Sequence, residues 1–206
     1  MMKYDVLNIE GKTEADFEKA FEAMSKNRQA RCKRYKFLQD RRRMAFGEEL
    51  LRKLMTSTLK AENQNIVIEN LPSGKPVAKL SGKEVNVSIT HSGDFVACAF
   101  SDTPVGIDLE EIREISPRLL NRFFSEEEKG FIRKENTSEK LSKQETQRFF
   151  ELWTAKEAYV KLTGEGLKGM DDAEVLPLVK HKKHGELVSE SIITEQYVCT
   201  IIYKKN

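Results

Sequence analysis

Two acidic side chains lie two residues apart in the segment Gly106-Ile107-Asp108-Leu109-Glu110. In a β-strand, alternate side chains point to the same face, so Asp108 and Glu110 share one side while Ile107 and Leu109 point toward a core. Neighbouring like charges repel each other unless a cation lies between them. Mg²⁺ binds one or two carboxylates and completes its shell with water and substrate phosphates. The spacing indicates a magnesium site, and the alternative is an edge strand whose acids are exposed to water.

A third acidic side chain shares one face of an expected helix with a base. Trp153, Glu157 and Lys161 follow one another at four-residue steps, which aligns them in one row along an α-helix. Apolar neighbours such as Phe149 and Leu152 serve the buried side. The alternative is a core tryptophan beside an ordinary surface ion pair, which stabilises a helix by about 0.3–0.5 kcal/mol. Both interpretations stay open from the row alone.

Basic residues are concentrated between residues 26 and 43, although the net charge of the 206-residue chain is only +2. The block comprises Lys26, Arg28, Arg31, Lys33, Arg34, Lys36, Arg41, Arg42 and Arg43, with Asp40 as the single acid. Such a block needs an anion, either a solvent counterion on an exposed face or the phosphate of a ligand.

Short alternating elements are expected to position these residues. Helical periodicity predicts helices at residues 16–26, 40–59, 117–124 and 147–163. Runs rich in β-formers predict strands at residues 66–68, 85–90, 95–100, 105–112, 173–179 and 196–203. Residues 91–94 are typical of a hairpin turn, and residues 134–146 of a polar loop. Ser125 is the expected N-cap of a further helix, with Glu128 at its capping-box position.

Each half of the chain runs from helices toward strands. Residues 95–100 and 197–202 both begin with an aromatic residue followed by valine, and each contains a cysteine. This similarity favours two related α/β lobes. The alternative is chance, because aromatic-valine strings are common in strands.

The composition is typical of a soluble protein with a core, at 39% hydrophobic and 33% charged residues. No apolar run of about 18 residues occurs and the first residues lack the apolar stretch of a signal peptide, so we expect a cytoplasmic protein with no membrane contact. Cys32, Cys98 and Cys199 are odd in number and far apart. We interpret them as packing or surface residues rather than as disulfides or paired metal ligands.

Three segments in order resemble the signature of the 4′-phosphopantetheinyl transferases. They are residues 106–110, residues 122–128 (Arg-Phe-Phe-Ser-Glu-Glu-Glu) and residues 153–161 (Trp-Thr-Ala-Lys-Glu-Ala-Tyr-Val-Lys). Gly74-Lys75-Pro76 and residues 87–93 extend the resemblance into the first half, so it covers most of the chain. The length resembles the double-lobed monomeric class, typified by the surfactin-synthetase activator.

The resemblance implies a fold. It is an α+β protein made of two similar α/β lobes with pseudo-twofold symmetry and the active site between them. Residues 1–103 would form an N-terminal lobe that binds the adenosine and phosphates of coenzyme A. Residues 104–206 would form a C-terminal lobe that binds magnesium and carries out catalysis.

The resemblance also implies roles for particular residues. Asp108, Glu110 and Glu157 would bind Mg²⁺, and Lys161 would be a catalytic cation beside the diphosphate. Glu128 is a candidate metal-water or general-base residue, and the capping role remains its alternative. The residues that would line the coenzyme A site are Arg28, Arg31, Arg43, Lys75, Thr90 and His91. Met44 stands where the family often has a hydroxyl residue beside the adenosine.

The implied reaction is phosphoryl transfer. A serine hydroxyl of an apo acyl or peptidyl carrier protein attacks the β-phosphorus of coenzyme A, and 3′,5′-adenosine diphosphate leaves. Glu157 or Glu128 is expected to remove the serine proton, directly or through a metal-bound water. Which of the two acts is left open by the sequence, as is the choice among fatty-acid, polyketide and nonribosomal-peptide carriers.

The carrier protein is expected to present an acidic helix. Lys156, Lys161 and Lys168, with Leu162, Leu167 and Met170 nearby, form a basic and apolar edge that could meet it. The alternative for these residues is a solvated helix end and loop. Two lobes in one chain make a monomer sufficient.

Two other functions compete with this one. A nucleic-acid-binding module could use the basic block, but only Tyr35 and Phe37 interrupt it as aromatic stacking residues and the whole chain is almost neutral. A non-catalytic relative that only binds coenzyme A would not need the acids and the base of the expected catalytic group, all of which are present: Asp108, Glu110, Glu157 and Lys161.

Overall fold

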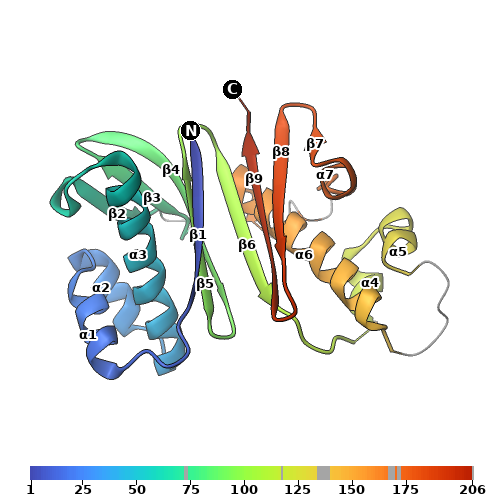
Figure 1. Ribbon diagram of the computed structural model, residues 1–206, viewed down its shortest axis with the longest axis horizontal. Coiled ribbons are helices and arrows are strands. Elements are labelled where there is room, and N and C mark those ends of the chain that lie inside the picture. Colours follow the sequence, from blue (N-terminus) through green and yellow to red (C-terminus); the bar gives the residue numbers. More distant parts are fainter. Residues whose placement is uncertain (72–73, 117, 134–139, 167–169, 171–172, 206) are drawn as a thin grey trace.

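The computed structural model describes residues 1–206 except 72–73, 117, 134–139, 167–169, 171–172 and 206. Within the described residues, two antiparallel sheets lie face to face with helices on the outer side of each (Figure 1). We call the first sheet with its helices the N-terminal lobe and the second sheet with its helices the C-terminal lobe. The arrangement confirms the expected α+β class built from two α/β lobes.

The N-terminal lobe packs helices on one face of a five-stranded sheet. Its elements are β1 (Met2–Asn8), α1 (Glu14–Glu22), α2 (Lys26–Lys33), α3 (Leu38–Leu59), β2 (Ile66–Asn70), β3 (Pro76–Leu80), β4 (Lys83–Ser92) and β5 (Phe95–Ser101). The strand order is β1-β5-β4-β3-β2, and every pair of neighbours is antiparallel. The long helix α3 buries Phe46, Leu51 and Met55 against this sheet.

The C-terminal lobe repeats this plan with four strands. Its elements are β6 (Val105–Glu111), α4 (Arg118–Phe123), α5 (Glu126–Ile132), α6 (Lys143–Thr163), α7 (Leu176–His181), β7 (Lys183–His184), β8 (Leu187–Ile193) and β9 (Tyr197–Lys204). The strand order is β6-β9-β8-β7. In both lobes the first strand pairs with the last, with Met2 opposite Ser101 and Val105 opposite Tyr203. The shared connectivity is what a pseudo-twofold arrangement requires.

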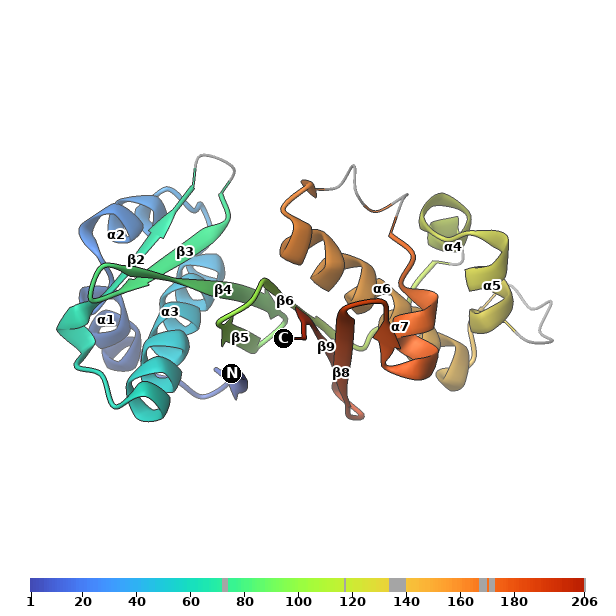
Figure 2. The same cartoon turned by 90° about the horizontal axis from the view of Figure 1, so that it is seen from above.

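A third core joins the two sheets. Alternate residues of β5, β6 and β9 meet there, including Ala97, Ile107 and Ile201, which have no exposed surface. The rings of Phe95 and Tyr197 are 4.7 Å apart across this boundary. These aromatic residues begin the two similar sequence strings, which therefore occupy corresponding strands. Figure 2 shows β4, β5, β6 and β9 along the boundary between the lobes.

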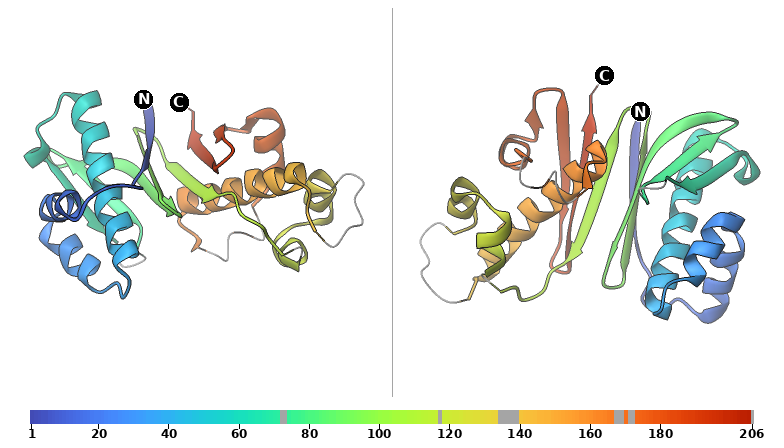
Figure 3. Two further views of the ribbon diagram at one scale, coloured as in Figure 1. Left: turned by 60° about the horizontal axis from the view of Figure 1, so that its bottom comes forward. Right: turned by 180° about the vertical axis from the view of Figure 1, so that it is seen from behind.

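Both chain ends lie beside the connection between the lobes. Asp102 N donates to Met1 O at 3.3 Å, and Lys204 N donates to Pro104 O at 3.2 Å. The N and C labels accordingly lie close together in both views of Figure 3. The connection is thus held by the first and the last strand of the protein.

The helices and strands that bear the site residues agree with the sequence patterns. The expected capping box of Ser125 and Glu128 is present at the start of α5. Helix α6 begins at Lys143, four residues earlier than expected, because Ser142 and Glu145 form a second capping box. Of residues 91–94, only Gly93 and Asp94 form the turn, while the first two complete β4.

The strand expected at residues 173–179 is wrong. Helix α7 begins at Leu176, and Pro177 lies in its first turn, where the fixed φ of proline suits a helix start. Its apolar residues Leu178 and Val179 face the core as part of a helix. The sequence patterns also missed helix α2 and strands β1, β3, β7 and β8.

Two further expectations concern cysteines and membranes. All three cysteines are free thiols and are buried, so they serve as packing residues. Among the helices in the described ranges, none combines the length and the hydropathy of a membrane-spanning segment.

Candidate active site between the two lobes

Close packing of α6 on β6 builds the acidic side of the site. A Cβ atom added to Gly106 would lie only 1.9 Å from the carbonyl oxygen of Ala158, so no larger residue fits there without a shift of the helix. This approach brings Glu157 and Lys161 over the outer face of β6. Ile107 and Leu109 point to the opposite face and are buried between the sheets. The strand thus has the two-faced pattern that its sequence predicted.

A row of hydroxyl side chains on β4 fastens the N-terminal lobe to β6. Ser88 Oγ accepts a hydrogen bond from Ile107 N at 3.2 Å. Thr90 Oγ1 donates to Asp108 Oδ1 at 2.8 Å, and Ser92 Oγ donates to Glu110 Oε2 at 2.8 Å. The row therefore orients both acids of the strand. Its period of two residues, Ser-x-Thr-x-Ser, is a sequence signal that the pattern analysis did not use.

Asp108 is a buried acid that is only partly satisfied. Its Oδ1 accepts hydrogen bonds from Thr90 and from Lys161 Nζ. Its Oδ2 is buried and has no hydrogen-bond partner among the described residues. Burial raises the pKa of Asp108, the charge of Lys161 opposes this shift, and the charge of Glu110 adds to it. The ionised form is therefore costly in the protein alone.

The other two acids lie within electrostatic reach of Asp108. Burial raises the pKa of Glu157, and the negative charges of Asp108 and Glu110 raise it further. Glu110 Oε2 also accepts a hydrogen bond from Arg113 at 2.8 Å. The structure thus brings Asp108, Glu110 and Glu157 into one electrostatic group, together with Lys161.

This acidic group fits a hard divalent cation in its chemistry, but its oxygens are not yet gathered around one point. Carboxylate oxygens are the ligands Mg²⁺ prefers, and Asp108 Oδ2 is a buried acceptor without a partner. A cation would also relieve the repulsion that raises the pKa of Glu157. Among the described residues, however, no three acidic, histidine or cysteine groups already form a ligand cluster. Lys161 binds Asp108, and Ser92 with Arg113 binds Glu110.

Cationic side chains from both lobes lie at the boundary between the lobes. Lys161 Nζ also donates to Thr90 Oγ1 at 2.9 Å, and Lys75 Nζ reaches across the boundary to Leu162 O at 3.1 Å. Burial lowers the pKa of Lys75, so its charge is partly desolvated. The site therefore combines acidic and basic groups in a space that both lobes share.

Arg43 adds a further cation on the N-terminal lobe, and His91 lies near it. Desolvation lowers the pKa of His91 although the residue as a whole is exposed, and the charges of Arg43 and Lys161 lower it further. Arg43 is held by Gly93 O at 2.8 Å and by Asp40 at 3.1 Å. The histidine and these cations are electrostatic neighbours, as expected of residues that surround an anion.

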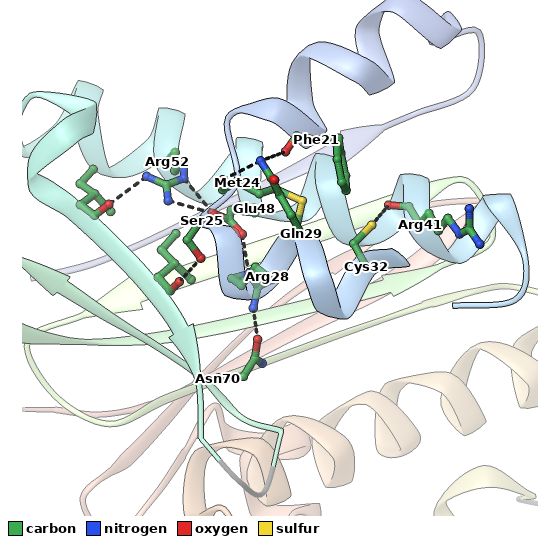
Figure 4. Close-up of polar contacts among 12 residues, drawn as sticks. Phe21, Met24, Ser25, Arg28, Gln29, Cys32, Arg41, Glu48, Arg52 and Asn70 are labelled. Carbon is green, nitrogen blue, oxygen red and sulfur yellow. Dashed lines mark hydrogen bonds and ion pairs between the residues drawn. The ribbon is translucent and has the colours of Figure 1, made fainter. Parts of the chain in front are cut away.

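Arg31 and Arg28 differ in exposure and in their partners. Arg31 is exposed and borders a hollow of about 590 Å³ together with Arg34, Asn70 and Leu71. Arg28, which the resemblance assigned to phosphate binding, is instead 5% exposed and paired with buried Glu48 and with Asn70 (Figure 4). Its guanidinium is engaged by partners of its own lobe, and Arg28 also borders the same hollow as Arg31. The phosphate contact of Arg28 therefore stays a prediction, and a structural role is its alternative. Met44 is buried in the same lobe.

Glu128 does not join the acidic group. One carboxylate oxygen accepts from Ser125 N at 2.8 Å, and the other is paired with Lys156 Nζ at 3.1 Å. Both side chains of this pair are buried, at 6% and 4% exposure. The pair borders a cavity of about 630 Å³ between α4, α5 and α7, which is not lined by any of the three acids. The capping interpretation of Glu128 therefore has direct support.

The structure does not expose all the residues of the expected carrier-binding edge. Lys156 and Met170 are buried, so they cannot form an exposed docking surface. Lys168 and Leu167 lie outside the described residues. Lys161 points into the interlobe site, and Leu162 is half-buried beside Lys75. The expectation of an exposed edge is therefore wrong for Lys156 and Met170, and for Lys168 and Leu167 it stays a prediction.

Comparison with known proteins gives one consistent result. Residues 12–103 match a family model described as 4′-phosphopantetheinyl transferase, N-terminal, and residues 104–202 match the model of the 4′-phosphopantetheinyl transferase superfamily. The chain is 31% identical over 185 residues to the 4′-phosphopantetheinyl transferase gsp of Aneurinibacillus migulanus, which covers 86% of this chain and 75% of that protein.

Two Bacillus proteins are also similar. Psf-1 of Bacillus pumilus is 38% identical over 144 residues, and Sfp of Bacillus subtilis is 30% identical over 151 residues; both are named 4′-phosphopantetheinyl transferases. The alignments cover 70% and 73% of this chain but only 59% and 64% of those relatives, less than two thirds of their lengths. The family models and these relatives confirm the expected family: the chain belongs to the 4′-phosphopantetheinyl transferase superfamily, of the surfactin-activator type.

Proposed function

We propose that this protein transfers the 4′-phosphopantetheine arm of coenzyme A to a serine of an apo acyl or peptidyl carrier protein. The observation that carries the proposal is the junction of Thr90, Asp108 and Lys161, in which side chains from both lobes meet at a buried acid with an unpartnered oxygen. The names of its relatives support the same activity. Two lobes in one chain supply both sides of this junction, so a monomer suffices.

The reaction exchanges one phosphorus–oxygen bond for another. The serine oxygen forms a bond to the β-phosphorus of coenzyme A, and the bond from that phosphorus to the bridging oxygen of the diphosphate breaks. The electron pair leaves with 3′,5′-adenosine diphosphate, and the serine proton passes to a base. Such transfers are accelerated mainly by positioning and by neutralisation of charge on the phosphate oxygens.

Asp108, Glu110 and Glu157 would hold Mg²⁺, with Asp108 Oδ2 as the acceptor that lacks another partner. When bound, the ion would neutralise charge on the diphosphate oxygens. Lys161 would bind the same oxygens, because its ammonium already lies at the junction of the lobes. Thr90 would keep Asp108 oriented through its hydroxyl.

The remaining basic residues would hold the rest of coenzyme A. Lys75 reaches the site from the N-terminal lobe, and His91 and Arg43 border it. Arg31 would bind the 3′-phosphate, since its guanidinium is exposed at the rim of the hollow. We divide the lobes between residues 103 and 104, which is also where the two family matches meet.

Glu157 is the better candidate for the base. It belongs to the acidic group at the junction of the lobes, where the serine hydroxyl would meet the diphosphate. The carboxylate of Glu128 is held by a backbone N–H group and by Lys156. A base that must stay paired to preserve the fold is poorly suited to take up a proton.

The direct test is intact-mass analysis of a purified apo carrier protein incubated with coenzyme A, Mg²⁺ and the enzyme. We expect the carrier to gain the mass of one phosphopantetheine arm and to keep its original mass when a chelator removes Mg²⁺. Fatty-acid, polyketide and nonribosomal-peptide carriers should be tested in parallel to identify the carrier that is modified. A carrier whose mass never changes would contradict the proposal, and salt-sensitive DNA binding by the chain would favour the nucleic-acid alternative.

A further inference from the structure

A buried carboxylate anchors two arginines inside the N-terminal lobe. Glu48 of α3 has no exposed surface and accepts one guanidinium on each oxygen, from Arg28 of α2 and from Arg52. Arg52 is tied further to Ile66 O at 2.9 Å. The charges sum to one surplus positive charge in the interior. Such a group is costly to bury unless its geometry is fully satisfied, which suggests that the position of Arg28 is closely fixed.

The network continues from Arg28 to the turn between β2 and β3. Arg28 Nη1 donates to Asn70 Oδ1 at 2.6 Å (Figure 4), and Asn70 Nδ2 donates to Gly74 O at 2.7 Å. In the same turn, Gly74 N donates to Leu71 O at 2.8 Å. Asn70 therefore links the buried arginine to the backbone on the far side of the turn.

Two ligand-binding residues depend on the placement of this turn. Gly74 directly precedes Lys75, which crosses the lobe boundary to Leu162 O beside Lys161. A Cβ atom added to Gly74 would lie 3.4 Å from Arg31 Nη2, so the guanidinium of Arg31 rests against this glycine. Movement of the Gly74 carbonyl would therefore shift both Lys75 and the surface on which Arg31 lies.

We propose that Glu48, Arg28 and Asn70 form a positioning relay that holds Lys75 in place at the diphosphate site. The same relay holds the backbone of Gly74, against which Arg31 rests. Glu48 holds Arg28, Arg28 orients the amide of Asn70, and Asn70 fixes the Gly74 carbonyl. Arg28 is then a positioning residue and not a phosphate ligand. The inference rests on the proposed function for the role of Lys75, while the relay itself is a structural claim.

Replacement of Arg28 by lysine distinguishes a positioning role from a phosphate-binding role. Lysine can bind a phosphate as a point charge, but it cannot donate to Glu48 and Asn70 in the fixed fork of a guanidinium. Arg28→Lys should therefore lower kcat/KM about tenfold for coenzyme A and equally for dephospho-coenzyme A, because both ligands meet Lys75. A phosphate-binding role predicts near-normal kinetics for Arg28→Lys and a loss confined to coenzyme A for Arg28→Ala. That pair of results would overturn the relay.

A double-mutant cycle tests whether the relay acts through Lys75. Asn70→Ala alone should lower kcat/KM about tenfold, since it removes the hydrogen bond to Gly74 O. In a Lys75→Met background it should cause little further loss, because the group it positions is gone. Losses that multiply would contradict the relay. Gln29→Ala is the matched control. Gln29 lies on α2 next to Arg28, and within the described part of the chain its side-chain amide donates only to carbonyls near the α1–α2 connection. The variant should therefore lower Tm without changing kcat/KM.

Amide hydrogen exchange provides a readout that does not require the proposed function. In Asn70→Ala the Gly74 amide should exchange about tenfold faster while amides in the middle of α3 keep their rates. Uniform acceleration over the lobe, or an unchanged Gly74 amide, would overturn the relay as a local device. A wild-type chain that transfers nothing would contradict the proposed function, and the exchange experiment would still decide the relay.

Discussion

Glu48 in the N-terminal lobe and Asp108 in the C-terminal lobe are both buried acids, but their surroundings differ. Each oxygen of Glu48 meets a guanidinium, from Arg28 or Arg52. Asp108 has one oxygen bound by Thr90 and Lys161 and one with no hydrogen-bond partner among the described residues. Glu48 lies within one lobe, whereas Asp108 lies where two lobes meet. Glu48 therefore illustrates a structural use of a buried charge, and Asp108 illustrates a chemical one.

This difference offers a criterion for assigning buried charges. A buried acid with complete partners mainly fixes neighbouring elements, and its removal damages the fold. A buried acid with a free oxygen and a raised pKa marks a place where a ligand can complete the group. Glu128 resembles Glu48 by this criterion, because Ser125 N and Lys156 occupy both of its oxygens.

The largest effect is expected from Asp108→Asn. The variant keeps an acceptor for Thr90 but loses the charge that would hold the cation, so transfer to the carrier should fall by on the order of 10³-fold. Tm should stay unchanged or rise, since the costly buried charge is gone. Steady-state transfer kinetics and thermal melts of the same preparation measure both quantities. Normal turnover in the folded variant would remove Asp108 from the mechanism.

Glu48→Gln should mainly reduce stability, whereas Asp108→Asn should mainly reduce transfer. Loss of the charge leaves two buried guanidiniums without a counterion, which costs about 3–5 kcal/mol of unfolding free energy. Tm should fall by roughly 10 °C, and denaturant titration gives the free energy directly. A stability equal to that of the wild type would show that Glu48 is not the anchor of its lobe.

Glu128→Gln tests whether Glu128 has a structural role, as Glu48 does, or a chemical one, as Asp108 does. We expect a loss of about 3 kcal/mol of unfolding free energy, because Lys156 is left buried without its partner. The folded fraction should keep the pH profile of kcat/KM. If Glu128 were the general base, the rate would fall about 10²-fold or more and the acidic limb of the profile would change. Glu128→Ala, which also loses the cap, is expected to be less stable still.

The smallest of these effects is expected from Arg31→Ala. Removal of an exposed guanidinium from the 3′-phosphate should weaken coenzyme A binding about tenfold. Dephospho-coenzyme A, which lacks that phosphate, should bind nearly as it does to the wild type. Calorimetric titration with both ligands makes the comparison, and equal losses would count against the assignment.

The sequence predicted the local part of the site well. The period of two in residues 106–110 placed Ile107 and Leu109 in a core and the acids on the other face, and the four-residue steps of α6 put Glu157 and Lys161 in one row. These relations depend on one element each. The role of Gly106 in admitting α6 was not foreseen, because it depends on how closely a helix approaches a strand.

Partners that lie far apart in the sequence could not be predicted in the same way. The family resemblance implied a phosphate contact for Arg28, and it gave no sign that Glu48 and Asn70, 20 and 42 positions away, engage its guanidinium. Lys156 looked exposed on a polar helix face, yet the arrangement of α5 beside α6 buries it against Glu128. Residues 173–179 read as a strand because short apolar runs fit either element, and Pro177 decided for a helix.

The claim that distant acids jointly hold a cation is tested most directly by metal binding. Mn²⁺, a hard cation that accepts the same oxygen ligands, can be titrated into the protein with coenzyme A while electron paramagnetic resonance measures the free ion. We predict that the wild type binds an equimolar amount and that Asp108→Asn and Glu157→Gln each weaken this binding strongly. Equal uptake by the wild type and both variants would contradict the account.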